Sequence, residues 1–173
     1  MTPSHNVVAF DSGTNVAIKT LRQRPDLLDQ VAAWHHRECL RQGIQTTLAK
    51  RKTRLHKHLS TDNAIPQTWL ALNARHLVGC ISLVSYHLTP IASQEPEPEP
   101  LWLSNLYVQP DFRCTGVGTQ LVDFVAAFAR GVGESELWLM ASEQTEFYHQ
   151  RGWQLVRQAR IAKQPVNVMR RAL

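Results

Sequence analysis

Apolar residues recur along this chain with two different spacings, which predict a mixture of strands and helices. Dense or alternating apolar residues predict strands over residues 14–21, 67–73, 77–88, 101–108, 136–141, 153–156 and 166–170. Apolar residues three and four apart predict helices over 26–41, from Thr46 or Thr47 to before Pro66, from about Gly118 to Gly131, and over 145–151. The predicted order is therefore β-α-α-β-β-β-α-β-α-β-β.

Short polar residues and glycines mark where the predicted helices begin and end. Asp26 is placed to cap the first helix, which should stop near Gly43. Gly131 occupies the position that follows the last turn of the third long helix. These signals support the helix boundaries that the apolar spacing gives.

The element order predicts an α/β fold with one mixed central sheet and helices on both of its faces. The strand–helix–strand unit over 101–141 requires a crossover between parallel strands, whereas 67–73 and 77–88 should pair antiparallel. Alternating prolines over 95–100 favour an extended loop between strands rather than a domain boundary. We expect a single domain over residues 1–173.

Composition excludes several classes of protein. The 173 residues are 43% hydrophobic and 19% charged, which is typical of a globular chain and not of a disordered one. No apolar run approaches the ~18 residues of a membrane span. The odd number of cysteines and the absence of a signal-peptide pattern at the N-terminus favour a cytoplasmic protein with free thiols.

The net charge of +5 is unevenly distributed. Residues 1–60 hold ten Lys or Arg against four Asp or Glu, whereas residues 91–173 hold eight against nine. The basic N-terminal part suggests an acidic substrate or a weak preference for polyanions. These cations can also simply form a solvated helix face, and we prefer this simpler interpretation. Nucleic-acid binding is not expected, because no aromatic residues alternate with the cations over 50–57.

A glycine-containing turn after the strand 101–108 predicts an anion site. The turn has the pattern Arg-x-x-Gly-x-Gly, from Arg113 to Gly118, and opens an amphipathic helix. Such a turn can direct several N–H groups into one concavity, and the helix N-terminus adds partial positive charge. The pattern matches neither the dinucleotide fingerprint nor the P-loop, and a simple glycine turn into a core helix is the alternative.

A second motif, Phe147-Tyr148-x-x-x-Gly152-Trp153, follows the strand 136–141. Together with Val108-x-Pro-x-x-Arg113-x-x-Gly-x-Gly118 and the closing strand near 166–170, it resembles the GNAT superfamily of acyl-CoA-dependent N-acetyltransferases. The resemblance is carried by residues 101–173, and residues 14–90 fit by pattern alone. It implies transfer of an acetyl group from acetyl-CoA to a primary amine of a small molecule or a peptide.

The resemblance also implies positions for the cofactor. The pyrophosphate would lie against main-chain N–H groups of Arg113, Cys114, Thr115, Gly116, Val117, Gly118 and Thr119. Leu106 and Val108 would pair with the pantetheine arm, and an N–H of Leu106 or Tyr107 would stabilise the oxyanion. Tyr148 would be the general acid that protonates the departing thiolate.

The acceptor should lie between the first two helices and the 95–100 loop, with Trp34, His35, Trp102 and Ser104 as its candidate contacts. No carboxylate lies within 101–108, so the general base stays open, with Glu143 or Glu146 as candidates acting through water. The histidines show no zinc pattern and are expected to be unliganded surface residues.

Two alternatives remain open. One is an acyl-CoA-binding sensor without turnover, and the other is a polyanion- or ribosome-associated protein. A monomer and a homodimer are both compatible with the sequence.

Overall fold

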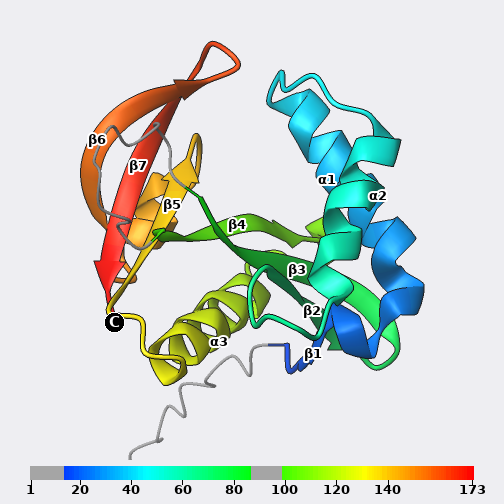
Figure 1. Cartoon of the computed structure of the whole chain (residues 1–173). Coiled ribbons are helices and arrows are strands. Elements are labelled where there is room, and N and C mark those ends of the chain that lie inside the picture. The colour runs from blue at the N-terminus through cyan, green and yellow to red at the C-terminus, as the bar shows by residue number, and fades with distance from the viewer. Residues whose placement is uncertain (1–13, 87–98) are drawn as a thin grey trace, which may run out of the picture.

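Seven strands form one mixed sheet, in the order β1-β2-β3-β4-β5-β7-β6 (Figure 1). The computed structural model describes residues 14–86 and 99–173. Only the β4–β5 pair is parallel in this part of the chain. The strands are β1 (Ala17–Thr20), β2 (Gln67–Asn73), β3 (His76–Ser85), β4 (Leu101–Val108), β5 (Glu136–Ala141), β6 (Gln154–Ile161) and β7 (Gln164–Ala172).

Helices cover both faces of this sheet, as the sequence predicts. On one face α3 (Val117–Gly131) packs over the centre of the sheet and builds the larger apolar cluster, to which Tyr148 of α4 (Thr145–His149) belongs. On the other face α1 (Leu28–Arg41) and α2 (Leu48–His56) lie side by side over the N-terminal strands (Figure 1). The two clusters are separated by the sheet, so alternate residues of β2 and β3 enter opposite cores.

The predicted fold class and element order are confirmed, and the antiparallel pairing of β2 with β3 and the parallel pairing of β4 with β5 are as expected. The last hairpin is longer than predicted. Strand β6 extends to Ile161 and β7 begins at Gln164. The tight turn between them is formed by Ala162 and Lys163, which both adopt positive φ although neither is glycine, so the sequence carries no usual turn signal there.

Two helix boundaries differ from the prediction. Asp26 does not cap the first helix; it lies in a short 3-10 turn (Pro25–Leu27) and forms an ion pair with Arg24 at 2.7 Å. Helix α3 includes Gly131, and the left-handed residue that follows its end is Gly133, with φ +95°. Thr47 caps α2 as proposed, because its side chain accepts the N–H of Lys50.

Strands β4 and β5 diverge strongly. They share a single register pair, Trp102 with Trp138, at one end of the two strands. Beyond this pair the strands splay apart and open a gap in the middle of the sheet. Within residues 14–86 and 99–173, no helix is both long and apolar enough to cross a membrane.

Candidate active site

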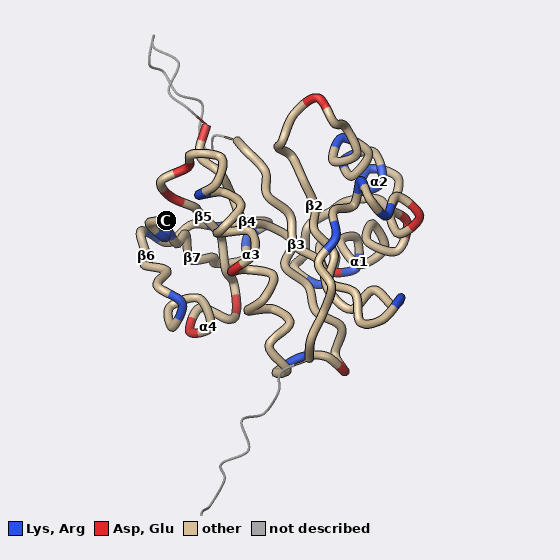
Figure 2. The backbone as a smooth tube through the Cα atoms, turned by 90° about the horizontal axis from the view of Figure 1, so that it is seen from below, with Lys and Arg blue, Asp and Glu red and all other residues tan. Residues whose placement is uncertain are grey.

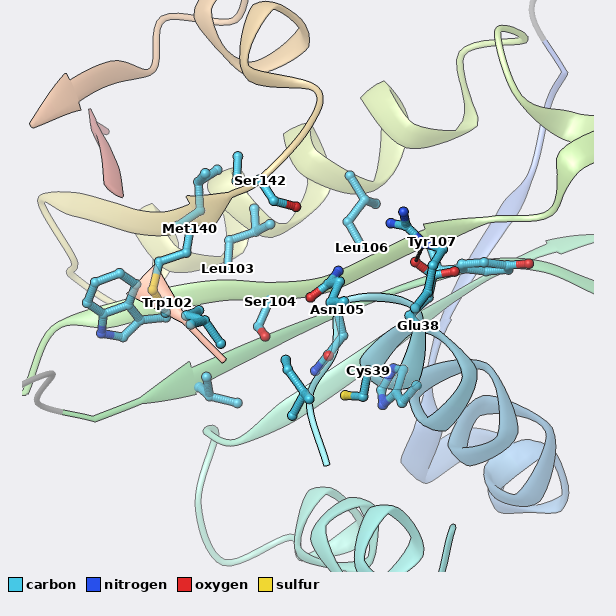
Figure 3. Close-up of a pocket in the computed structure, with 18 of the residues that line it drawn as sticks. Glu38, Cys39, Trp102, Leu103, Ser104, Asn105, Leu106, Tyr107, Met140 and Ser142 are labelled. Carbon is cyan, nitrogen blue, oxygen red and sulfur yellow. Dashed lines mark hydrogen bonds and ion pairs between the residues drawn. The ribbon is translucent and has the colours of Figure 1, made fainter. Parts of the chain in front are cut away.

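A cavity of about 590 Å³ occupies the region where β4 and β5 diverge. Residues 102–107 of β4 form one wall, and the end of β5 with the segment that follows it forms another. Helices α1 and α2 form the third wall, from which Glu38 and Cys39 are seen in Figure 3 beside the β4 residues. Tyr148 lines the cavity from α4. The site therefore combines residues that are more than 100 positions apart in the sequence.

A β-bulge interrupts β4 beside this cavity. Ser104 lies opposite Ser82 and Tyr107 lies opposite Cys80, so Asn105 and Leu106 together face the single residue Ile81. Asn105 adopts a left-handed conformation with φ +54°, which is uncommon for a residue other than glycine and occurs often at functional sites. The bulge breaks the regular ladder between β4 and β3, on the strand whose other edge borders the gap beside β5. The oxyanion donor was proposed at this same place, at Leu106 or Tyr107.

The predicted anion loop follows β4 and leads into α3. Cys114 and Gly116 have positive φ, +59° and +89° respectively, which gives the sharp turn that the sequence predicts. Gly116 is the N-cap of α3 and offers no capping side chain. Within the described residues, the N–H groups of Val117, Gly118 and Thr119 donate to no other group. Unpaired N–H groups at a helix N-terminus are a favourable environment for a phosphate.

The loop residues differ in how their side chains are placed. The Arg113 Nε donates to the carbonyl of Val108 at 2.9 Å, and its guanidinium lies 5.7 Å from the centre of the Tyr107 ring. Val117 is 1% exposed and belongs to the core, so only its backbone is available for a ligand. Among the ten predicted cofactor contacts, only Leu106 and Tyr107 line the cavity itself. The other eight contacts lie at the end of β4, in the loop that follows it and in the first turn of α3.

Tyr148 lies deep in the site with its ring between those of Phe147 and Trp153, at centroid distances of 5.1 and 6.0 Å. Its burial raises the pKa of the phenol to about 12, and the charge of Arg151 opposes this shift. The hydroxyl is therefore fully protonated near neutral pH and is available as a hydrogen-bond donor. The ring of Tyr148 belongs to the core, and the residue also lines the cavity.

Three of the four predicted acceptor contacts line the cavity: His35, Trp102 and Ser104. Trp34 does not, which corrects the prediction. Its ring packs on that of Tyr107 at 4.7 Å, inside the cluster between α1 and the sheet. His35 is the next residue of α1, about 100° further around the helix axis, and this rotation places it at the cavity. Residues 95–98 of the predicted acceptor loop lie outside the described residues.

Two histidines are buried, which corrects the expectation that all of them are surface residues. His35 lies with its Nε2 atom 3.7 Å from the Cys80 Sγ atom. Burial, followed by the charge of Arg51, lowers the pKa of His35 to about 3. The Nδ1 atom of His58 lies 2.9 Å from the hydroxyl of Thr68, and burial lowers the pKa of His58 to about 4. Both imidazoles are neutral at pH 7.

Carboxylates also reach the cavity, from outside β4. Glu38 of α1 and Glu143 of the segment after β5 both line it. Arg41 joins them, with its Nε 3.0 Å from Glu38 and its Nη1 3.1 Å from Glu143. This pairing spans the cavity from α1 to the segment that follows β5. Sequence spacing alone does not reveal the pair of Arg41 with Glu143, since the two residues are 102 positions apart. No group of residues that could hold a metal ion occurs in the described parts of the chain.

Comparison with known proteins identifies the family. The model of the acetyltransferase (GNAT) domain matches residues 64–155, which is more than half of the chain. The chain therefore belongs to the GNAT acetyltransferases, and the family that the two motifs suggested is confirmed. This family defines the enzyme class and the cofactor, acetyl-CoA. No curated protein sequence matches the chain.

Solved structures of the same fold include N-acetylglutamate synthase from Neisseria gonorrhoeae bound to coenzyme A and N-acetylglutamate, with 19% identity and a TM-score of 0.66. That match covers 92% of this chain and 35% of the synthase, so this chain spans about a third of its length. An aminoglycoside 6′-N-acetyltransferase bound to coenzyme A has 17% identity and a TM-score of 0.68, over 90% of this chain and 96% of that one. A GNAT acetyltransferase from Streptococcus pneumoniae has 18% identity and a TM-score of 0.66, over 92% and 99%.

Proposed function

We propose that this protein transfers an acetyl group from acetyl-CoA to a primary amine by direct attack of the amine. The observation that carries the proposal is the cavity between the diverging strands β4 and β5, which is lined by both Asn105 of the bulge and Tyr148 and is followed along the chain by the unpaired N–H groups of α3. The described residues share one sheet, which supports a single domain. The names of two neighbouring structures, an N-acetylglutamate synthase and an aminoglycoside 6′-N-acetyltransferase, support an amine as the acceptor here.

The residues present fit acetyl-CoA, which supplies a thioester when bound. The first N–H groups of α3 and those of residues 114–116 would hold the pyrophosphate, because these donors have no other partner in the described structure, whereas the N–H of Arg113 donates to the carbonyl of Pro110 at 3.2 Å. Leu106 and Val108 would pair their backbones with the pantetheine arm at the open side of β4. Cys114 is exposed in the loop and has no role as a nucleophile in this scheme.

The chain's own groups then serve the transfer of the acyl group. As the amine nitrogen bonds to the carbonyl carbon and the carbon–sulfur bond breaks, an N–H of Leu106 or Tyr107 donates to the carbonyl oxygen. Tyr148 gives its proton to the sulfur. A phenol of pKa about 12 is a weak acid for this role, but burial disfavours a thiolate in the same cavity as well, which raises the proton affinity of the sulfur.

The base that receives the ammonium proton is proposed to be Glu143, acting through water. Glu143 lines the cavity, whereas Glu146 does not. His35 is a weaker candidate, because a pKa of about 3 makes its neutral imidazole a poor proton acceptor.

The experiment that tests this proposal measures binding and turnover separately. Coenzyme A should raise the melting temperature, by mass action on the folded state. Acetyl-CoA with a mixed pool of primary amines should release free thiol. Binding without thiol release would support the sensor alternative, and the absence of both would contradict the proposal. Retention on heparin without retention on a coenzyme A resin would favour the polyanion alternative.

A further inference from the structure

Helix α2 presents a selected set of its cations to the cavity. Figure 2 shows Lys and Arg concentrated along this helix. Two of these cations, Arg51 and Arg54, line the cavity, and the nearby Leu55 and His58 line it too. These positions are spaced i, i+3, i+4 and i+7, so they form one helical face. Lys50 and Lys57 flank Arg54 at i−4 and i+3, are exposed, and do not line the cavity.

These two arginines lack acidic partners in residues 14–86 and 99–173. Arg51 is half-buried, and its recorded contact is from Nε to the Thr46 hydroxyl at 3.3 Å. Arg54 lies at the exposed rim and forms no ion pair within the same ranges. Arg41 is different, because Glu38 and Glu143 both neutralise it. Among the described residues, the acceptor side of the cavity therefore carries two positive charges that no acidic side chain pairs, and they lie one helical turn apart, where like charges repel each other.

A short path of contacts connects these charges with the reacting end of the cavity. Arg51 lies close enough to His35 to lower its pKa. His35 in turn contacts the Cys80 Sγ atom, and that sulfur also lies 3.7 Å from the carbonyl oxygen of Asn105 in the bulge. A small molecule between the bulge and α2 would thus have its amine near β4 and its other end near the arginines.

We propose that the acceptor is a small primary amine that also carries an anionic group, a carboxylate or a phosphate, and that Arg51 and Arg54 bind this group. This inference rests on the proposed acetyl transfer. The planar guanidinium presents paired N–H donors that match the oxygens of a carboxylate or phosphate. The bound anion also relieves the repulsion between the two side chains. Two of the five cations of residues 50–57 therefore have a role in binding, whereas Lys52 pairs with Asp29 at 3.0 Å and Lys50 and Lys57 are exposed to solvent.

The test compares acceptors that differ only in the anionic group. L-amino acids are compared with their α-carboxamides, and phosphoethanolamine with ethanolamine, at fixed acetyl-CoA. The unmodified protein should show a kcat/KM at least about tenfold higher for the anionic member of one pair, the effect of one or two charge-assisted hydrogen bonds. The pair that shows this preference identifies carboxylate or phosphate.

The variants Arg51→Gln and Arg54→Gln should raise KM for the anionic acceptor at least about tenfold when combined, and should leave KM for the neutral member unchanged. The matched variants Lys50→Gln and Lys57→Gln remove the same charge from the same helix and should leave both KM values unchanged. Retention of the thermal shift by coenzyme A shows that each variant is folded and binds its cofactor.

Equal or greater kcat/KM for the neutral amines would overturn the inference, and so would equal effects of the arginine and lysine variants. Turnover of neutral amines alone would still support acetyl transfer. Failure of the proposed function has a separate signature, which is the absence of a thermal shift by coenzyme A in the unmodified protein. Coenzyme A binding without turnover of any anionic amine would also overturn the inference.

Discussion

The Nη2 atom of Arg151 lies 2.6 Å from the Oγ1 atom of Thr119, so the end of α4 is bonded to the first turn of α3. The same guanidinium donates from Nη1 to the carbonyl of Phe147 at 2.7 Å and lies over the Phe147 ring at 3.7 Å. Tyr148 follows Phe147 directly, and Thr119 is the third residue of the helix that begins at the anion loop. Arg151 thus connects the proposed general acid to the proposed pyrophosphate site.

We predict that Arg151→Met weakens both the fold and this connection. The free energy of unfolding should fall by about 1–3 kcal/mol, since a charged hydrogen-bond donor is lost from a half-buried position. Thr119→Val removes the partner hydroxyl, and a double-mutant cycle should give a coupling energy of about 0.5–3 kcal/mol for the pair. Urea unfolding measures all four values. Arg157→Met on the exposed strand β6 serves as control, and additive effects of the two substitutions would contradict the coupling.

Tyr148→Phe should slow acetyl transfer while coenzyme A binding is retained. The substitution removes one hydroxyl and leaves the ring that packs on Phe147 and Trp153. General acid catalysis typically contributes about 10²–10⁴-fold, so we expect at least about a tenfold loss in single-turnover rate. Acceptor KM should change less than kcat.

Tyr86→Phe provides the matched control for that experiment. Tyr86 also lines the cavity, and burial also raises the pKa of its phenol to about 12, but its ring stacks on Trp102 at 5.1 Å. This variant should transfer acetyl groups nearly as fast as the unmodified protein. A single-turnover rate for Tyr148→Phe equal to that of Tyr86→Phe would remove Tyr148 from the mechanism.

Gly116→Glu should abolish the thermal shift that coenzyme A produces. A side chain at this position would strain the backbone, because φ is +89°, and its carboxylate would repel the phosphates. Gly133→Glu introduces the same group at φ +95° beyond the other end of α3, with open space around it. Both variants should lose stability through backbone strain. Only the first should lose the shift, measured by thermal denaturation with and without millimolar coenzyme A.

The two buried histidines predict that stability falls at mildly acidic pH. The pKa values of His35 and His58, about 3 and about 4, lie below the ordinary value of 6.5. At pH values between the folded-state pKa of each histidine and 6.5, the unfolded chain binds a proton that the folded chain does not. The free energy of unfolding is therefore highest above pH 6.5 and decreases on acidification, by up to about 1.4 kcal/mol per pH unit for each histidine.

Urea unfolding of the His35→Gln/His58→Gln variant at several pH values between 7.5 and 5 tests this dependence. The variant should lose much of the decrease, whereas exposed His76→Gln should keep it. Parallel curves for the double variant and the unmodified protein would contradict the assignment.

Local signals in the sequence were sufficient for most of the fold. The apolar spacing places α1, α3 and the central strands within a few residues of their observed bounds, because each element buries one face against the same sheet. The length of the last hairpin was predicted too short, and the reason is physical. The residues of β6 are mostly exposed, so its sequence shows little apolar alternation, and Ala162 and Lys163 adopt positive φ without glycine.

The cavity could be predicted only in part. Ser104 and Trp102 come from one strand whose role the two motifs suggest. Glu38, Arg41 and the buried state of His58 depend on how α1 and α2 pack over the sheet. Such contacts depend on tertiary packing and leave no periodic signal along the chain. The choice between Trp34 and His35 is similar, since an unaligned sequence does not fix the rotation of a helix about its axis.

The bulge in β4 also determines how this strand can change during evolution. Leu101 and Leu103 before the bulge and Leu106 and Val108 after it all contact the α3 cluster, although the step between Leu103 and Leu106 is three residues. The side chains before and after the bulge therefore alternate out of phase with each other, and the phase changes at Asn105. If Asn105 took up a regular extended conformation, strict alternation over all eight residues would turn the outer half of β4 over, with Tyr107 toward α3 and Leu106 away from it. Position 105 therefore needs a residue that tolerates the left-handed conformation, whereas its deletion would remove the bulge and keep Leu106 and Val108 toward α3.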